Sequence, residues 1–284
     1  CKLLELVRFS HTLFALPFAL LSAAIAWKAE PFRERDLLGI LLCMVFARNF
    51  AMAFNRIADR DVDARNPRTA SRHLPAGTLS FGLVAAFAVA NAVAFVGACF
   101  LFANPWPLFR SGPILLFLAG YSLTKRFTFL AHAWLGLALM LAPVAAWIAV
   151  RGLVDMHTPL LLGAAVLFWV TGFDILYACQ DAEFDAREGL HSIPARFGVR
   201  RSLRIAAACH AMTFLLLIGF IVATPLLKGP VFIGTGVAVG VLLVYEHCLV
   251  SADNLAKVNK AFFHVNAVIS LGLLAAGVVQ LYLS

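Results

Sequence analysis

The chain has 284 residues, of which 62% are hydrophobic and 13% are charged, and its mean hydropathy is +0.89. A soluble domain carries about a quarter charged residues, so this composition excludes an ordinary soluble protein and indicates a polytopic membrane protein. The formal net charge of +8 then reflects membrane topology and attraction to phosphate or lipid headgroups. We expect no nucleic acid partner, because no soluble basic domain exists to hold a duplex.

Nine apolar segments of roughly 20 residues, the length that crosses a bilayer, predict an all-α fold. In chain order they cover residues 11–29, 37–56, 80–103, 112–129, 131–151, 159–180, 202–222, 230–250 and 260–282. Prolines stand at or just outside several segment ends, where a missing N–H does least harm. Only a few polar residues separate the fourth and fifth segments, so eight crossings with one long buried hairpin is the alternative topology.

Lysine and arginine are distributed unequally between alternate connections. With nine spans, sixteen of the 23 lie on the side of the N-terminus, six lie on the other side, and Arg48 lies inside the second segment. Because positively charged short loops remain in the cytoplasm, this bias predicts a cytoplasmic N-terminus.

Eight of the fifteen acidic residues fall in two short stretches, each beginning within or at the end of a predicted span. The two stretches contain Asp59, Asp61, Asp63 and, further along, Asp174, Asp181, Glu183, Asp185 and Glu188. An ionised group at membrane depth costs up to about 3 kcal/mol, so a protein retains it where a ligand or an ion compensates the charge. The two stretches are therefore the main candidates for a functional site.

The two acidic stretches also resemble each other. Residues 59–65 read Asp-Arg-Asp-Val-Asp-Ala-Arg, and residues 181–187 read Asp-Ala-Glu-Phe-Asp-Ala-Arg. Four predicted spans separate them, so both point to the same membrane face. This pattern predicts a parallel pseudo-repeat of two four-helix halves plus a ninth helix, with a site at the junction of the halves.

Helical geometry groups the polar residues of the first stretch. At 100° per residue, Asn55, Asp59 and Asp63 stay on one face. Arg48 lies within about 20° of Asn55, whereas Asp61 points to the opposite side.

The second stretch has the same property. Asp174, Tyr177, Asp181 and Asp185 share a face, while Glu183 turns away. Two such helices would offer paired carboxylates to a common cavity.

Carboxylate pairs without histidine or cysteine suit a hard cation that prefers oxygen ligands. Magnesium typically takes one or two carboxylates together with phosphate oxygens of a substrate, so the expected ligand is a magnesium-bound diphosphate. The cations available to such a ligand are Arg68, Arg72, Lys125, Arg126 and Arg196. Metal and cations together would stabilise departing pyrophosphate.

Simpler interpretations stand beside these. Asp61, Glu183 and Glu188 are expected to be solvated, weakly ion-paired acids. Lys125 and Arg126 could equally be anchors that set the topology. Histidines without a metal-like arrangement are interpreted as hydrogen-bonding residues, namely His11, His73, His132 and His191.

Three motifs make the chain resemble the UbiA-type intramembrane aromatic prenyltransferases, and the resemblance spans nearly the whole chain. The first is Asn-Arg-Ile-Ala-Asp-Arg-Asp-Val-Asp at residues 55–63, followed by Ser-Arg-His-Leu-Pro-Ala-Gly at residues 71–77. The second is Asp-Ile-Leu-Tyr-Ala-Cys-Gln-Asp-Ala-Glu-Phe-Asp at residues 174–185, followed by Ser-Ile-Pro-Ala-Arg-Phe-Gly at residues 192–198. Between them, residues 121–126 match the family's Tyr-x-x-x-Lys-Arg element.

The resemblance implies one domain over residues 1–284, with nine helices around a central cavity and a lateral opening for a polyprenyl tail. It also implies magnesium that links both aspartate motifs to the diphosphate. The metal ligands carried over by position are Asn55, Asp59, Asp63, Asp181 and Asp185. One departure is visible, because many members have Asp where this chain has Arg56, which puts an extra carboxylate contact in doubt.

The resemblance assigns further roles by position. Arg72 and Lys125 would grip the diphosphate, and Arg196 is a further substrate-binding candidate. Arg48, Tyr121 and Asp174 fall where acceptor binding or ring deprotonation would occur, and the catalytic candidates are Asp174 and Tyr121. The implied reaction is an electrophilic substitution, in which an allylic cation attacks an electron-rich ring and a base removes the ring proton in a cavity that excludes water.

Residues 173–177 and 189–194 are similar to the bacterial quinone-biosynthesis branch, which implies a 4-hydroxybenzoate acceptor. The resemblance also implies the bacterial inner membrane, with the active site toward the cytoplasm. Dihydroxynaphthoate, used for menaquinone, is the alternative acceptor, and either aryl carboxylate could pair with Arg48. Within the enzyme class, haem, chlorophyll and lipid-ether prenylation stay open as well.

Two other classes of protein are possible, an ion transporter and a structural quinone-binding subunit. A transporter needs a path to both membrane faces, whereas these charges gather at the cytoplasmic ends. A structural subunit gives no reason for two Asp-x-x-x-Asp pairs. No protein partner is implied.

Overall fold

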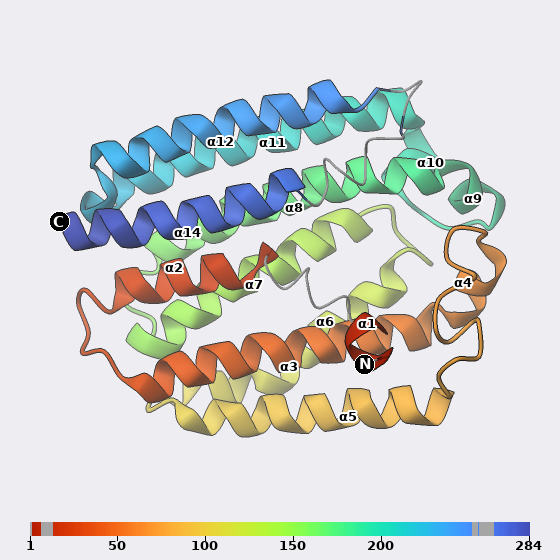
Figure 1. The fold of residues 1–284 in the computed structure, drawn as a ribbon, viewed down its shortest axis with the longest axis horizontal. Coiled ribbons are helices and arrows are strands. Elements are labelled where there is room, and N and C mark those ends of the chain that lie inside the picture. Colours follow the sequence, from red (N-terminus) through yellow and green to blue (C-terminus); the bar gives the residue numbers. More distant parts are fainter. Residues whose placement is uncertain (1, 7–13, 252–254, 256–263) are drawn as a thin grey trace. The chain divides into compact units, whose positions relative to one another are not determined.

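The computed structural model describes residues 2–6, 14–251, 255 and 264–284, and the fold is all-helical, as predicted (Figure 1). The longer helices are α2 (Leu16–Ala26), α3 (Glu34–Ala58), α5 (Phe81–Ala98), α6 (Trp106–Thr124), α7 (Ala131–Arg151), α8 (His157–Ala178), α11 (Val199–Ala223), α12 (Pro230–Leu249) and α14 (Asn266–Leu283). The short ones are α1 (Lys2–Leu6), α4 (Arg60–Arg65), η2 (Cys99–Leu101), η3 (Cys179–Asp181), α9 (Ala182–Arg187), α10 (Ile193–Phe197) and η4 (Pro225–Leu227).

Seven helices within the described residues are long and apolar enough to cross a membrane. These candidate spans start at the first residues of α3, α5, α7, α8, α11, α12 and α14. The two other predicted segments also form helices, but α2 has only 11 residues, and the first half of α6 contains Arg110 and Pro113. Each of the nine predicted segments therefore overlaps a helix, and seven meet the requirements for a span. Residues 11–13 and 260–263 of the predicted segments lie outside the described residues.

The fourth and fifth predicted segments form two separate helices, α6 and α7. The chain divides into two compact units, with boundaries after residues 12, 32 and 123. Unit 1 comprises residues 1–12 and 33–123, and unit 2 comprises residues 13–32 and 124–284.

Unit 1 is built on the packing of α3 against α5 and η2. A buried polar contact crosses this interface, where the Asn49 side-chain amide donates to Asn91 Oδ1 at 3.0 Å, and Asn91 Nδ2 donates to the Phe87 carbonyl oxygen at 2.8 Å. Because amides buried in apolar surroundings need partners, this pair fixes the register of α3 on α5. Leu74 and Leu79, in the loop after α4, pack into the same core and anchor that loop.

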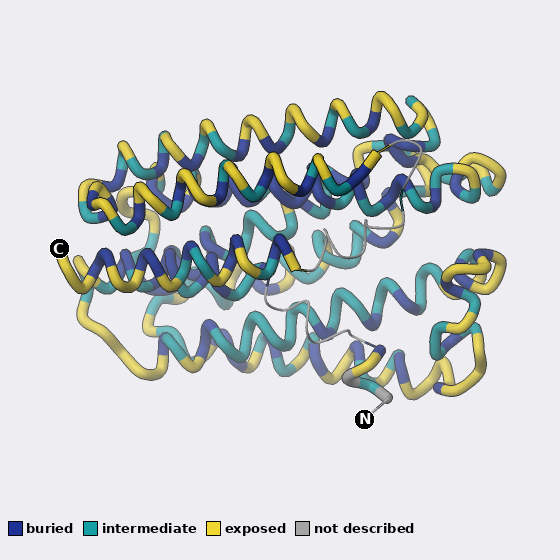
Figure 2. Tube along the Cα trace, turned by 45° about the horizontal axis from the view of Figure 1, so that its top comes forward, coloured by how far each residue is buried: buried dark blue, intermediate teal, exposed yellow. Residues whose placement is uncertain are grey.

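Unit 2 is built around α8, which packs against α7 on one side and α11 on another. The described helices α11 and α12 run side by side (Figure 1). Exposed and buried residues alternate along the helices (Figure 2), and the exposed apolar side chains of α12 include Ile233, Val237, Val241 and Val244. Spacings of three and four residues place these side chains on one stripe, which suits contact with lipid.

The compact units differ from the predicted division into two four-helix halves. That division would group the first segment with the three that follow it, but α2 packs against α7 and α14 within unit 2. The Ser22 hydroxyl donates to the Pro143 carbonyl oxygen of α7 at 2.7 Å, and Leu21 lies against Gly277 of α14. Direct contacts with α7 and α14 thus place α2 in unit 2. The pseudo-repeat remains a prediction from the sequence.

The helices α7 and α8 approach each other closely at Gly136. A Cβ atom at this position would meet the Leu167 carbonyl oxygen and the Thr171 hydroxyl. The absence of a side chain at Gly136 therefore permits the contact that brings the first turns of α7 against the second half of α8.

We expect Gly136→Ala to destabilise the protein by about 1 to 3 kcal/mol, because the new methyl group must push α7 away from α8. Gly234→Ala is the matched control, since a Cβ there meets nothing within 4 Å. The control should be neutral or stabilising by up to about 1 kcal/mol, as expected for Gly→Ala in a helix. Thermal unfolding of both variants in detergent checks this, and equal midpoints would contradict the close-packing account.

Candidate functional site

The first acidic motif lies where α3 ends and α4 begins. Asp59 is the break between the two helices, with φ of −95° and ψ of 5°. The Asp63 N–H still donates to the Asp59 carbonyl oxygen at 2.7 Å, so the helical course continues through the break. Asn55 Nδ2 donates to Asp59 Oδ2 at 2.7 Å, which confirms that Asn55 and Asp59 lie on the same side of the chain.

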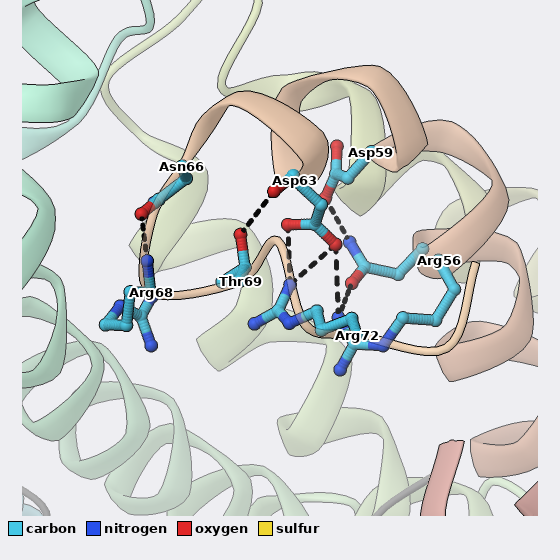
Figure 3. Close-up of polar contacts among 8 residues, drawn as sticks. Arg56, Asp59, Asp63, Asn66, Arg68, Thr69 and Arg72 are labelled. Atoms are coloured by element: carbon cyan, nitrogen blue, oxygen red, sulfur yellow. Dashed lines mark hydrogen bonds and ion pairs between the residues drawn. The ribbon is translucent and has the colours of Figure 1, made fainter. Parts of the chain in front are cut away.

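Asp63 is buried and is surrounded by positive charge (Figure 3). Arg72 Nη1 donates to both of its carboxylate oxygens, at 2.7 and 2.8 Å. Arg56 Nη1 lies 3.9 Å from Asp63 Oδ2. The backbone of Asp63 is held as well, because the Thr69 hydroxyl donates to its carbonyl oxygen at 3.1 Å.

A tight loop after α4 positions Arg72. The Arg68 N–H donates to Asn66 Oδ1 at 2.9 Å, a local turn typical of asparagine (Figure 3). The Ala70 N–H donates to the Asn66 carbonyl oxygen at 2.8 Å, and the Arg72 N–H donates to that of Thr69 at 2.9 Å. These turns fold the chain back, so that Arg72 reaches the acid that precedes it by nine residues.

Arg56 entered the sequence argument only as a departure from the family motif, and the position of its side chain was missed. Arg56 is 7% exposed, and its Nη1 lies 3.5 Å from Asn55 Oδ1 as well as near Asp63. The signal was available, because a spacing of seven residues places Arg56 and Asp63 within about 20° on a helix.

The second acidic motif repeats the local backbone of the first. Its α8 helix ends at Ala178, a 3₁₀ turn follows, and α9 begins after Asp181, whose φ of −104° and ψ of 5° are close to those of Asp59. Asp181 is buried and so is Asp185, the counterpart of buried Asp63. The two stretches that match in sequence thus also match in local structure.

Lys125 lies beside the second motif. Its Nζ is 3.5 Å from Asp185 Oδ2. The loop after α9 fixes this pair, because the His191 N–H donates to the Lys125 carbonyl oxygen at 2.7 Å and the Leu190 N–H donates to that of Asp185 at 2.8 Å. The structure therefore brings together two side chains that the sequence predicted as a diphosphate ligand and a metal ligand.

Asp174 pairs with a histidine. His132 Nδ1 lies 2.7 Å from Asp174 Oδ2, and the Ile193 N–H donates to His132 Nε2 at 3.4 Å. Since Nε2 accepts, the network assigns the proton to Nδ1, which donates to Asp174. His132 is fully buried, whereas the Asp174 side chain is 16% exposed. The sequence predicted a hydrogen-bonding role for His132 but not its link to Asp174, because 42 residues separate the two.

The other predicted site residues have different surroundings. Arg196 has its guanidinium carbon 4.3 Å from the ring centroid of Phe129 and 5.4 Å from that of Phe197. Arg48 and Tyr121 are both half-buried, in α3 and α6 of unit 1. Their roles, and that of Arg196, remain predictions.

Of the three acids expected to be solvated, Asp61 and Glu183 are exposed and Glu188 is half-buried. Asp61 and Glu183, which the helical geometry turned away from the motifs, are exposed, whereas Asp63 and Asp185 are buried. The position of a carboxylate within each motif therefore determines whether its side chain is buried or exposed.

Each motif can contribute oxygen ligands to a cation. Among the described residues, no group of three or more His, Cys, Asp and Glu side chains is arranged to hold a metal. The first motif offers Asn55, Asp59 and Asp63, and the second offers Asp181 and Asp185. This all-oxygen set fits magnesium, which takes few protein carboxylates and fills its remaining positions with water and substrate oxygens.

Comparisons with known proteins agree with these motifs. Residues 15–268 match the model of the UbiA prenyltransferase family. A 4-hydroxybenzoate octaprenyltransferase from Methylobacillus flagellatus is 33% identical over 236 residues, which cover 82% of this chain and 78% of that protein. One from Burkholderia cenocepacia is 30% identical over 288 residues, with coverage of 99% and 96%.

Solved structures show the same fold. A UbiA homologue from Aeropyrum pernix, solved in its apo form, matches with a TM-score of 0.85 and 30% identity, covering 95% of this chain and 97% of that one. A UbiA homologue from Archaeoglobus fulgidus, bound to DMAPP and Mg²⁺, matches with a TM-score of 0.72 at 20% identity over the full length of both chains.

We expect Asp63→Asn to lower the stability by about 1 to 3 kcal/mol, because it leaves Arg72 and Arg56 close together without a carboxylate between them. Asp61→Asn, which alters an exposed acid of the same short helix, is the matched control and should change stability by less than about 0.5 kcal/mol. Thermal midpoints in metal-free detergent solution measure both. Equal midpoints for the two variants would show that the ion pairs of Asp63 do not contribute to the stability of the fold.

Proposed function

The chain belongs to the UbiA prenyltransferase family, and from this premise we propose that it transfers a polyprenyl group from polyprenyl diphosphate to 4-hydroxybenzoate in quinone biosynthesis. The observation that carries the proposal is the duplicated acid motif, in which Asp63 and Asp185 are each buried beside a cation. The names of the relatives support the acceptor, since several of them are 4-hydroxybenzoate octaprenyltransferases.

In this proposal both acid motifs serve the binding of magnesium and the diphosphate. The side chains that would hold magnesium are those of Asn55, Asp59, Asp63, Asp181 and Asp185. Bound magnesium would act as a Lewis acid that stabilises the leaving diphosphate. The Archaeoglobus fulgidus homologue, which was solved with DMAPP and Mg²⁺, supports this assignment at the level of the fold.

Arg72 and Lys125 would bind the diphosphate oxygens. Each now lies against an aspartate of its own motif, Arg72 at 2.7 Å and Lys125 at 3.5 Å. The loop hydrogen bonds of each residue hold its backbone near these aspartates, so its side chain can reach a diphosphate bound there. Arg196, which stacks on Phe129, would be a further cation for the substrate.

The reaction then proceeds by substitution on the aromatic ring. The bond between C1 of the prenyl chain and the diphosphate oxygen breaks, and its electron pair leaves with pyrophosphate. C1 bonds to a ring carbon of the acceptor, and the proton on that carbon must leave to restore aromaticity. Asp174 would take this proton, and His132 would orient the carboxylate through its Nδ1–H.

The acceptor would bind near the candidates Arg48 and Tyr121. The Arg48 guanidinium can pair with an aryl carboxylate, and the Tyr121 hydroxyl can hydrogen-bond to the acceptor. Dihydroxynaphthoate also carries a carboxylate, so it is the alternative acceptor. The proposed location is the bacterial inner membrane with the site toward the cytoplasm, on the basis of the distribution of lysine and arginine.

The direct test is product analysis by mass spectrometry. Membranes containing the protein receive magnesium, a polyprenyl diphosphate, and 4-hydroxybenzoate together with dihydroxynaphthoate in competition. We expect prenylated 4-hydroxybenzoate, which disappears on chelation of the metal and in Asp59→Ala and Asp181→Ala. Asp61→Ala and Glu183→Ala, which alter exposed acids of the same motifs, should retain activity. A prenylated naphthoate would identify the alternative acceptor, and full activity of both test variants would refute the metal role.

We expect His132→Gln to lower kcat about ten- to a hundredfold while KM for the prenyl diphosphate changes less than about threefold, because His132 positions the proposed base and not the diphosphate. His73→Gln is the control, since His73 lies in unit 1 beside Glu5. Steady-state kinetics on both variants provide the readout. An increase in KM alone would place His132 in substrate binding and contradict this role.

A further inference from the structure

The first acid motif carries as much positive as negative charge among its central side chains. Asp59 and Asp63 supply two carboxylates, and Arg56 and Arg72 supply two guanidinium groups (Figure 3). Arg72 occupies both oxygens of Asp63, while Arg56 lies 3.9 Å from Asp63 and 3.5 Å from the Asn55 oxygen. Both arginines therefore lie next to atoms that would be metal ligands.

This arrangement opposes the binding of a bare divalent cation. A cation that takes Asp63 as a ligand must share or replace the contacts of Arg72, and it lies close to two positive groups. A unit charge about 7 Å from a divalent cation changes the affinity by about tenfold even at the dielectric constant of water, and by more at a partly buried site. Asp63 and Arg56 are 6% and 7% exposed, so solvent screens their interaction poorly.

A diphosphate reverses this effect. Its oxygens accept hydrogen bonds from guanidinium groups in the same forked geometry as a carboxylate, so they offer both arginines an alternative partner. The contact of Arg56 with Asp63 is a long ion pair of 3.9 Å and not a bidentate one. The loop holds the Arg72 backbone in place while its side chain changes partner.

We propose that Arg56, together with Arg72, makes metal binding at the Asn55–Asp63 motif conditional on the diphosphate, so that metal and diphosphate bind together and neither binds strongly alone. This inference rests on the proposed function, because it concerns the same metal and diphosphate. Arg56 is a positioning and specificity residue in this account. By linkage, the factor by which the diphosphate tightens metal binding equals the factor by which the metal tightens diphosphate binding.

The measured quantity is this coupling factor. Free Mn²⁺ is followed by electron paramagnetic resonance in titrations of the purified full-length protein, with and without inorganic pyrophosphate. A protein-free titration corrects for the Mn²⁺–pyrophosphate complex. The reciprocal pyrophosphate affinity is measured by calorimetry with and without Mn²⁺, and no turnover is needed for either measurement.

We expect the wild-type coupling factor to be at least about a hundredfold, a value set by two positive charges that each contribute about tenfold. Arg56→Gln should bind Mn²⁺ alone about tenfold more tightly and should lower the coupling factor about tenfold, because one positive charge is removed. Arg56→Lys keeps that charge but loses the forked pair of donors, so its affinity for Mn²⁺ alone should stay within about threefold of the wild type. Arg60→Gln, an exposed arginine on the neighbouring α4, is the matched control and should leave both values unchanged.

Two results would separate this inference from the proposed function. A wild-type coupling factor near one, with Mn²⁺ and pyrophosphate each binding, would overturn the inference and leave the proposed function intact. Equal behaviour of Arg56→Gln and Arg60→Gln would do the same. If the wild type binds neither Mn²⁺ nor pyrophosphate even when both are present together, the proposed function itself is refuted.

Discussion

A carboxylate buried in an apolar helical protein needs a partner that compensates its charge, and this constraint organises both acid motifs. The desolvation penalty of an ionised group in a low-dielectric region amounts to several kcal/mol, and it is tolerable only where a cation or hydrogen-bond donor is close. Asp63 has Arg72 and Arg56, and Asp185 has Lys125. The loop after α4 brings Arg72 back to Asp63, and the loop after α9 holds Lys125 beside Asp185, whereas Arg56 comes from the last turn of α3.

The helical framework supports this arrangement from a distance. Helix α8 carries Asp174 and leads into the second motif, and its close approach to α7 at Gly136 places His132 beside Asp174. In unit 1, the Asn49–Asn91 contact fixes α3 against α5, and α3 ends in the first motif. Each motif thus lies at the end of a helix whose position is set by buried contacts further along it.

Much of this was predictable from the sequence, because the bilayer imposes a simple rule on helices. Apolar segments of sufficient length located every long helix, and helical spacing separated buried Asp63 and Asp185 from exposed Asp61 and Glu183. Contacts between distant segments were not predictable in the same way. The pairing of His132 with Asp174 depends on the packing of two helices, and the approach of Arg72 to Asp63 depends on turns whose geometry no periodicity encodes.

Arg56 illustrates a different limit. The family motif marks the residue as a departure, and this directs attention to the carboxylate that it replaces. The structure shows instead what the guanidinium does, since it lies beside Asn55 Oδ1 and Asp63 Oδ2 and changes the charge of the motif. The packing of α2 against α7 and α14 is a further contact between distant segments that no local sequence pattern encodes.

The central claim is that the buried acids of both motifs bind a divalent metal together with a diphosphate. Anomalous scattering from crystals grown with Mn²⁺ and pyrophosphate tests it most directly. The account predicts manganese within about 2.0 to 2.2 Å of carboxylate oxygens of each motif, with pyrophosphate oxygens among its other ligands. Manganese and pyrophosphate bound away from these carboxylates would contradict it.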